Sequence, residues 1–441
     1  MCPTEHSNEE ASPNISFFKQ IIFRWRYENC RQYAKQGVPD AQLQLAFFHL
    51  RGTGVSQNPK EGEYWLLKAA AQGNSAAQTC LGILYTGSEN LLPKDENESL
   101  RWFRLAAGQG EEFAQVSLAT ALIRGNGTDR NFPEAMMWLH RAADQGNLDA
   151  QYFLGQAYKD EDNLDRNSTL SFQWLKKAAE KNHPGAQYEL GNCYENGIGV
   201  ETDPVEAFRW TKLAAEQEYD EAEAKLGFYY LCGYGVAIDN AEAFSWFRKS
   251  AMQGLPTGEY FLGECYFRGV GTESDVIQGV EWLRHAASRN FAAAQFQLGT
   301  IYLYGNGVPQ NKAEGIHYIQ TAANNGYPAA QDILGCCCYF GDGIEKDDVQ
   351  AFYWFREAAS AGNINAFYNL GDCYRKGIGT AKNPEEAISW YQRAASAGHP
   401  GAMFELGRCY QNGVGVNQNL EEASKWFQRA KELGLTELED N

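Results

Sequence analysis

The chain lacks long apolar runs, and it contains few basic residues and few histidines. Its longest apolar stretch, residues 17–23, is interrupted by Lys19 and Gln20 and is too short to cross a membrane or to act as a secretory signal. The 38 lysines and arginines face 56 aspartates and glutamates, which gives a net charge of −18. This balance argues against nucleic acid or an anionic membrane as a partner, because both attract basic surfaces. It permits a basic protein partner.

Motifs that carry catalytic or metal chemistry are also absent. The seven histidines are scattered without H-x-x-x-H spacing, and no G-x-S-x-G nucleophile elbow occurs. The acidic residues between 160 and 165 lack the glycine and the final glutamate of a calcium-binding EF-hand loop, so they predict a solvated loop. We therefore expect no catalytic residues, no cofactor, no metal site and no small-molecule substrate.

A unit of 36 residues repeats along nearly the whole chain, and residues 186–221 show it best. Its skeleton is A-x-x-x-L-G-x-x-Y-x-x-G-x-G, a polar turn, and A-x-x-W-x-x-x-A-A. The glycine after the leucine, here called the marker glycine, recurs at Gly82, Gly155, Gly191, Gly227, Gly263, Gly299, Gly335, Gly371 and Gly407, with Ala46 and Ala119 in the same slot. Eleven units follow one another, and one step is 37 residues long because of an insertion near residues 89–93. A fixed period of this size is typical of a solenoid.

Each unit predicts two helices. The apolar residues of the first half recur at helical spacing on one face, and Gly197 predicts a left-handed C-cap. Asp203 before Pro204 predicts an N-cap with proline at the first helical position of the second helix. The tryptophan of the second helix, such as Trp210, is expected to fill the space between repeats. Such a hairpin cannot bury its apolar face alone, so neighbouring repeats must stack.

The repeat divides the chain into four parts. Residues 1–14 are polar and predict a disordered tail, and residues 15–40 predict a capping helix that resembles the second half of a repeat. An amphipathic membrane helix is the alternative for residues 15–37, because Lys19, Arg24, Arg26 and Arg31 lie there. Residues 41–434 hold the eleven repeats, and residues 435–441 form an acidic tail.

The cysteines predict buried free thiols. Five of the eleven occupy one slot, two residues after the marker glycine, where other repeats hold leucine, alanine or phenylalanine: Cys193, Cys265, Cys337, Cys373 and Cys409. Such a slot uses cysteine as a small hydrophobic residue. Free thiols in this number favour a reducing compartment, so we expect a cytoplasmic protein. The alternative is a periplasmic lipoprotein whose signal peptide has been replaced ahead of Cys2.

These repeats resemble the Sel-one-like repeat family, which is related to the tetratricopeptide repeats. The resemblance covers about residues 41–434 and implies an all-α fold, a right-handed α-solenoid of eleven helix-turn-helix repeats. Members of the family are interaction scaffolds and adaptors, which implies the same role here. Some members carry disulfides between the two helices of a repeat, but the second helices here hold no matching cysteine.

The resemblance also places a binding groove on the first helices. It implies that the exposed positions lie three residues before the marker glycine and one, four and five residues after it. We expect the groove in repeats six to nine, and the candidate partner-binding residues at these positions are Phe228, Leu231, Tyr260, Phe267, Arg268, Phe296, Leu303, Tyr304, Tyr339, Phe340, Tyr368 and Arg375. Aromatic and arginine side chains are common in interface hot spots. For the residues three before the glycine, packing against the preceding repeat is the alternative.

A second candidate surface is acidic. Residues 189–223 hold ten acidic residues but only two basic ones, and we expect a basic partner to meet Glu195, Glu201, Glu216, Glu218, Asp220 and Glu221. We expect a monomeric, non-enzymatic scaffold or adaptor that binds a protein or peptide in its groove. The alternative is a stoichiometric inhibitor, such as an immunity protein that neutralises a bacterial toxin. An enzyme is the remote alternative and would have to use Asp332, Asp372 and Glu264, which lack a base or nucleophile beside them.

Overall fold

The computed structural model describes residues 13–160 and 166–435, with side chains from residue 24 onward. The described residues form 23 helices and no strand. The predicted polar tail and acidic tail lie outside the described residues, apart from residues 13–14 and 435. None of the described helices combines the length and the apolar character that a membrane crossing needs. The chain divides into two compact units, residues 1–219 and 220–441.

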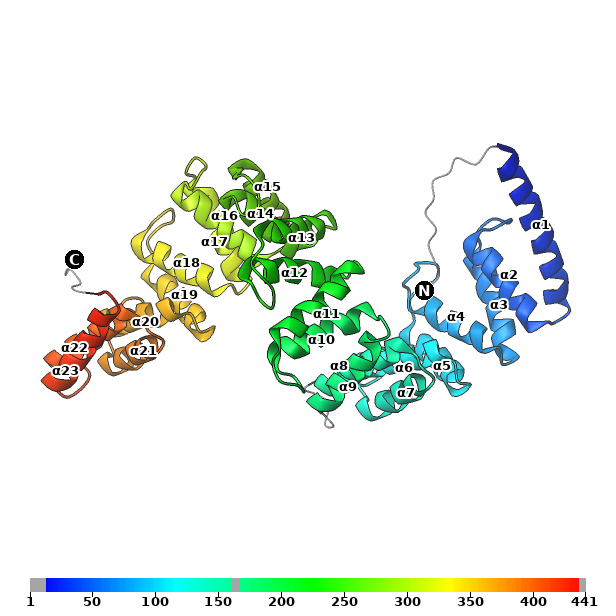
Figure 1. Ribbon diagram of the computed structural model, residues 1–441, viewed down its shortest axis with the longest axis horizontal. Helices are drawn as coiled ribbons and strands as arrows, with labels where there is room; N and C mark the ends of the chain where they lie inside the picture. The colour runs from blue at the N-terminus through cyan, green and yellow to red at the C-terminus, as the bar shows by residue number, and fades with distance from the viewer. Residues whose placement is uncertain (1–12, 161–165, 436–441) are drawn as a thin grey trace. The chain divides into compact units, whose positions relative to one another are not determined.

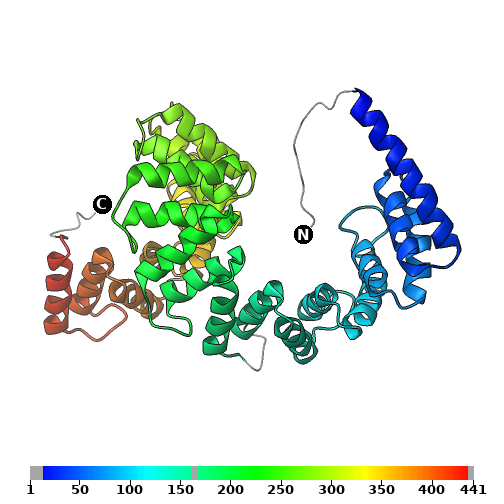
Figure 2. The ribbon, with the colours of Figure 1, turned by 45° about the vertical axis from the view of Figure 1, so that its right-hand side comes forward.

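The first unit contains a long first helix, α1 (Pro13–Lys35), and five helix pairs (Figures 1 and 2). Consecutive helices pack against each other in chain order. The first helices of these pairs are α2 (Pro39–Arg51), α4 (Ser75–Tyr85), α6 (Glu112–Arg124), α8 (Leu148–Lys159) and α10 (Pro184–Asn196). The second helices are α3 (Pro59–Ala71), α5 (Glu96–Gly108), α7 (Phe132–Asp144), α9 (Ser168–Ala179) and α11 (Pro204–Glu216).

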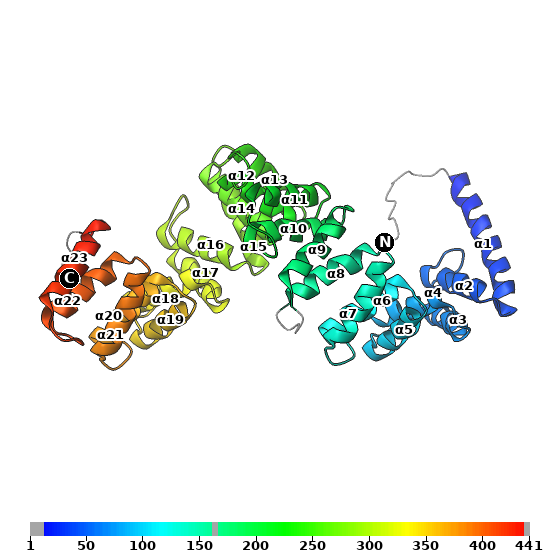
Figure 3. The same cartoon turned by 60° about the horizontal axis from the view of Figure 1, so that its bottom comes forward.

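The second unit contains six further pairs with the same order of packing (Figure 3). The first helices are α12 (Asp220–Cys232), α14 (Pro256–Arg268), α16 (Ala292–Tyr304), α18 (Pro328–Phe340), α20 (Ile364–Lys376) and α22 (Pro400–Asn412). The second helices are α13 (Asn240–Met252), α15 (Val276–Ser288), α17 (Lys312–Asn324), α19 (Asp348–Ser360), α21 (Pro384–Ser396) and α23 (Leu420–Glu432). The prediction of an all-α solenoid of helix pairs is therefore confirmed.

Local sequence fixes the ends of these helices. The Asp203 side chain accepts hydrogen bonds from the backbone N–H groups of Val205 and Glu206, so the predicted N-cap of α11 is confirmed. Every second helix begins with such an aspartate or asparagine cap. Gly197 has a φ of 69° and closes α10, as predicted. The second glycine of the G-x-G pair has another role, because a Cβ at Gly271 would collide with the backbone oxygen of Asn240 in the preceding repeat.

The marker glycine provides the closest approach between the two helices of a repeat. A Cβ on Gly227 would lie 2.7 Å from the ring of Phe247, which follows the repeat tryptophan Trp246 and is fully buried. The same residue faces the marker glycine in other repeats, as Phe103, Leu175, Leu283, Ile319, Phe355, Tyr391 and Phe427. The repeat tryptophan itself is only partly buried in several repeats, where it packs against a core cluster, as Trp138, Trp174 and Trp282 do. Trp246 is only half-buried, and its neighbour takes the deepest position.

A buried glutamine joins consecutive repeats by hydrogen bonds. Gln187 on α10 donates its Nε2 to the carbonyl of Ala179 on α9 at 3.3 Å, and its Oε1 accepts from Nε2 of Gln217 at 2.6 Å. Equivalent pairs of bonds are made by Gln42, Gln78, Gln115 and Gln295. Since Gln42 bonds to Ala34, the end of α1 takes the place of the second helix of a repeat. Two repeats place Glu223 and Glu259 in this slot instead.

Candidate interaction surface

The predicted groove residues of repeats eight and nine include two strongly exposed aromatic side chains. Tyr304, at the end of α16, is 56% exposed, and Phe340, at the end of α18, is 73% exposed. Both lie five residues after a marker glycine, so they occupy equivalent positions on successive first helices. Tyr339 packs edge-on against Phe340, with 4.7 Å between the ring centroids, and Lys346 lies over the Tyr339 ring. Phe228 on α12 is also exposed.

The aromatic residues three before the marker glycine are half-buried and pack within the solenoid. The Tyr260 ring lies 5.5 Å from that of Phe291. The other two of this group make equivalent contacts, Phe296 with Tyr327 at 5.1 Å and Tyr368 with His399 at 4.7 Å. Each partner residue immediately precedes the first helix of the following repeat. These rings therefore pack toward the following repeat rather than the preceding one, and they offer a partner only part of their surface.

Four other predicted groove residues are less available than expected. The expectation that Leu303 is exposed is wrong, because it is 1% exposed and packs with Ile316 and Cys337. Leu231 and Phe267 are half-buried against neighbouring core clusters. Arg375 bonds to Asp372, Glu405 and the Tyr391 hydroxyl, all in its own or neighbouring helices: the distances are 3.0, 3.7 and 3.1 Å. Helical spacing from the glycine identifies a slot, but neighbouring residues decide how much of it remains exposed.

The predicted acidic surface is divided between the two units. Glu195, Glu201, Glu216 and Glu218 belong to the first unit, whereas Asp220 and Glu221 begin the second. All except the half-buried Glu195 are exposed. Glu216 lies 3.9 Å from Lys212, and such an exposed pair contributes little to stability.

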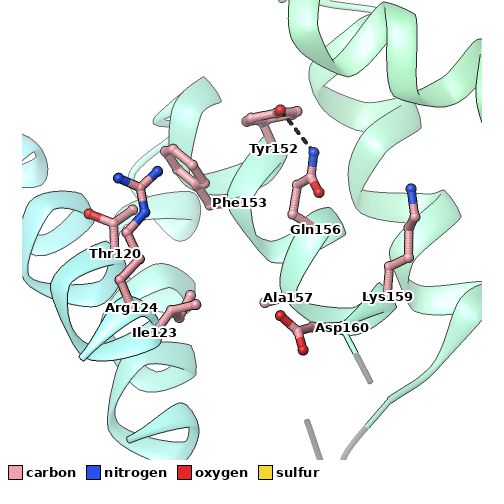
Figure 4. Close-up of a pocket in the computed structure, with 9 residues that line it drawn as sticks. All are labelled: Thr120, Ile123, Arg124, Tyr152, Phe153, Gln156, Ala157, Lys159 and Asp160. Carbon is pink, nitrogen blue, oxygen red and sulfur yellow. Dashed lines mark hydrogen bonds between the residues drawn. The ribbon is translucent and has the colours of Figure 1, made fainter. Parts of the chain in front are cut away.

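The first unit contains a hollow that the sequence analysis did not identify. It lies between α6 and α8 and has a volume of about 470 Å³ (Figure 4). Thr120, Ile123 and Arg124 of α6 face Tyr152 and Phe153 of α8 across it, and Gln156, Ala157, Lys159 and Asp160 complete the lining. Most of these residues stand at the same offsets from Ala119 and Gly155 as the predicted groove residues do in later repeats. These residues are a mixture of polar and apolar types, so they form no aromatic or apolar run in the sequence.

The three carboxyls that an enzyme would have to use are bonded to structural partners. Asp332 accepts a hydrogen bond from Asn369 at 2.9 Å, and burial raises the pKa of its carboxyl. Burial also raises the pKa of Glu264, although its ion pair with Arg268 opposes this shift.

Asp372 differs from these two carboxyls, because its bonds to cations and a hydroxyl lower its pKa by more than burial raises it. Burial alone would raise its pKa, but Lys376 at 2.6 Å, the Tyr391 hydroxyl at 2.6 Å and Arg375 hold it below its usual range. The thiol of Cys336, which accepts a hydrogen bond from the Asn369 amide that also bonds to Asp332, is a poor nucleophile, since burial raises its pKa to about 12. Among the described residues, no cluster of histidine, cysteine, aspartate and glutamate could hold a metal ion.

The cysteines of the described residues are all free thiols, and six of those ten are buried outright in the repeats. Cys193 is an example: burial raises its pKa to about 11. Cys232 is the exposed member of the set. The slot two residues after the marker glycine therefore holds cysteine as a core residue, as predicted.

Comparisons with known proteins agree with this architecture. The Sel1 repeat model matches eleven consecutive segments, which together run from residue 39 to residue 435. A protective antigen of uropathogenic Escherichia coli with an SLR fold is 30% identical, covers 93% of this chain and 88% of its own, and superposes with a TM-score of 0.67. A Sel1 repeat protein from Oxalobacter formigenes is also 30% identical and covers 74% of this chain and 92% of its own, with a TM-score of 0.53.

Curated relatives match over shorter lengths. Chitin synthase regulatory factor 3 of Schizosaccharomyces pombe is 33% identical over 104 residues, which is 23% of this chain and 11% of that protein. The chain spans at most a fifth of the length of the curated relatives reported by this comparison. Because the Sel1 repeat model matches nearly the entire described chain, the protein belongs to the Sel1 repeat family.

Proposed function

We propose that this chain is a non-enzymatic scaffold that binds a protein or peptide along its first helices in repeats eight and nine. The observation that carries the proposal is the exposure of Tyr304 and Phe340 at equivalent positions of α16 and α18. Soluble proteins rarely leave large aromatic side chains together on a surface unless a partner covers them. Aromatic residues also dominate interface hot spots, because they bury a large area with few rotatable bonds.

Two further observations support a scaffold. Sel1 repeat folds are typical of protein–protein interaction. A chitin synthase regulatory factor, which is similar over part of this chain, is named for regulating another protein. An adaptor would hold several partners with moderate affinity, whereas an inhibitor of the immunity-protein type would hold one partner tightly.

Site-specific photo-crosslinking tests the location of the binding surface. Residues 304 and 340 are replaced in turn by a photoreactive phenylalanine analogue in the native cell, and Tyr353 serves as a matched control. Tyr353 is an exposed aromatic residue of the same unit, but it lies on the second helix α19. We expect positions 304 and 340 to crosslink the same protein and position 353 to leave it unlabelled. Equal labelling from all three positions, or none from 304 and 340, would contradict the proposal.

A further inference from the structure

The hollow between α6 and α8 contains an arginine, Arg124, that is not held by an ion pair with the described residues, although Asp160 also lines this hollow. Arg124 is exposed at the end of α6 and makes no ion pair or hydrogen bond with the described residues. The other basic residue of the hollow, Lys159, is held by Glu189 at 2.9 Å.

Comparison with equivalent repeats explains why Arg124 is left unpaired. Arg268 and Lys376 stand at the same position, five residues after the marker glycine, and each pairs with a carboxylate four residues earlier. The distances are 2.7 Å for Arg268 with Glu264 and 2.6 Å for Lys376 with Asp372. Such spacing places the two side chains on neighbouring turns of one helix face. In repeat three this earlier position holds Thr120, whose hydroxyl instead donates to the carbonyl of Ser117.

Arg124 also lies between two hollows. A second hollow of about 260 Å³ on the other side of α6 shares Thr120 and Arg124 with the first. Its apolar lining includes Leu100, Phe103 and Ala121, and its cation Lys94 is paired with Glu96 at 2.6 Å. Apolar side chains line part of each hollow. The half-buried Ile123 and Phe153 belong to the first, whereas in the second the nearly buried Leu100 and Phe103 lie among mainly polar lining residues.

We infer that this surface binds a peptide segment of another protein that carries an aspartate or glutamate between apolar side chains. The partner carboxylate pairs with Arg124, and the flanking apolar side chains enter the two hollows. An arginine is well suited to this role, because its guanidinium can bind a carboxylate through two parallel hydrogen bonds. The inference rests on the proposed scaffold function and adds a binding surface in the first unit with a defined partner chemistry. It differs from the basic partner expected for the acidic residues around repeat five.

The Thr120 position provides a direct test. Thr120→Glu places a carboxylate four residues before Arg124, as Glu264 is placed before Arg268, and neutralises the arginine without removing it. Thr120→Gln is the matched control, because glutamine has nearly the same size as glutamate but carries no charge. Arg124→Gln removes the cation itself. Both positions are partly or fully exposed on the helix, so circular dichroism and melting of the full chain should be unchanged for all three variants.

The experiment is a selection of random peptides displayed on phage, carried out with the full-length wild-type chain and each variant. We expect wild-type and Thr120→Gln proteins to enrich peptides with an acidic residue flanked by apolar ones. Synthetic copies of those peptides should bind Thr120→Glu and Arg124→Gln about tenfold more weakly, which corresponds to about 1.4 kcal/mol. Glutamine in place of the peptide's acidic residue should weaken binding to the wild type to a similar degree, and salt should weaken it further.

Three outcomes would overturn the inference. One is enrichment of peptides that carry no acidic residue, and another is equal binding to the Thr120→Glu and Thr120→Gln proteins. The third is competition by free glutamate as strong as that by the peptide, which would show a site for small acids. Failure of the scaffold proposal would give a result different from these three. In that case neither the wild type nor any variant, including one changed at Tyr304 and Phe340, would retain a peptide.

Discussion

At the scale of single residues, the slot that joins neighbouring repeats shows how one side-chain change alters an interface. Glutamine in this slot can donate to a backbone carbonyl of the preceding repeat and accept from a glutamine of its own repeat at the same time, as Gln187 does. Glu223 cannot donate when it is ionised, and it is fully buried. It accepts from Lys249 at 3.0 Å and from Gln253 at 3.1 Å, while its Oε2 has no hydrogen-bond partner. An unsatisfied buried polar atom of this kind reduces stability.

Glu223→Gln should therefore stabilise the helices around it at neutral pH, by about 1 kcal/mol. Burial raises the pKa of Glu223 in the folded chain, with Lys249 opposing the shift, so the folded state binds more protons than the unfolded state between the two pKa values. Stability of the wild type must then fall as pH rises through that window, and the advantage of the glutamine variant must shrink as pH is lowered toward 4. Native-state hydrogen exchange of α12–α14 at pH 7 and pH 5 measures both effects. A variant that is less stable than wild type at pH 7 would show that the Lys249 pair outweighs the desolvation.

At the scale of helices, each repeat is organised by a contact between a marker residue on the first helix and a buried residue on the second. Where the marker is glycine, bulky rings are accommodated, as with Gly227 and Phe247. Where the marker is alanine, at Ala46 and Ala119, the position after the tryptophan holds leucine: Leu66 and Leu139, both fully buried. A methyl group on the first helix thus accompanies a smaller side chain on the second.

This pairing predicts compensation between two substitutions. Gly227→Ala should destabilise α12 and α13 by about 1–3 kcal/mol, because its Cβ would overlap the Phe247 ring. Phe247→Leu alone should also destabilise them, by leaving a cavity. The double variant should be more stable than the sum of the two single effects predicts, since it recreates the alanine–leucine pair. Urea unfolding of the four proteins in this cycle measures the coupling, and strictly additive losses would refute the pairing.

Helix caps give a second prediction at this scale. The Nδ1 atom of His399 accepts a hydrogen bond from the backbone N–H of Ala402 at 3.1 Å, which requires that nitrogen to be unprotonated. Burial lowers the pKa of His399 in the folded chain. The folded state therefore binds fewer protons, and the stability from this cap is present above the usual histidine pKa of about 6.5 and is lost as pH falls below it.

His399→Asn replaces the pH-sensitive cap by the residue that other repeats use, such as Asn147 and Asn363. We expect hydrogen-exchange protection at the start of α22 to fall by about 1 kcal/mol between pH 7.5 and pH 5.5 in the wild type. The asparagine variant should keep its protection over that range, because its cap does not titrate. Equal pH dependence in the two proteins would show that another group controls this helix.

At the scale of the whole molecule, the period of the sequence determined much of the architecture in advance. Repeated alanine, leucine, glycine and capping residues predict helix pairs, since these signals act locally and recur eleven times. Burial was harder to predict, because it depends on which neighbour fills a space. Phe247 lies deeper than Trp246, and Leu303 is covered although Tyr304 beside it is exposed. Arg124 lacks an ion pair because Thr120 stands where repeats seven and ten hold a carboxylate, and an aromatic run in the sequence gives no sign of this difference.

The central claim is that the exposed aromatic residues of α16 and α18 bind the partner, and one comparison tests it most directly. The full chain is purified from its native cell as wild type, as a Tyr304→Ser/Phe340→Ser variant and as a Tyr353→Ser control, all with unchanged circular dichroism. We expect the wild type and the control to retain the dominant associated protein and the double variant to lose it. Retention of the same partner in equal amount by all three proteins would contradict it.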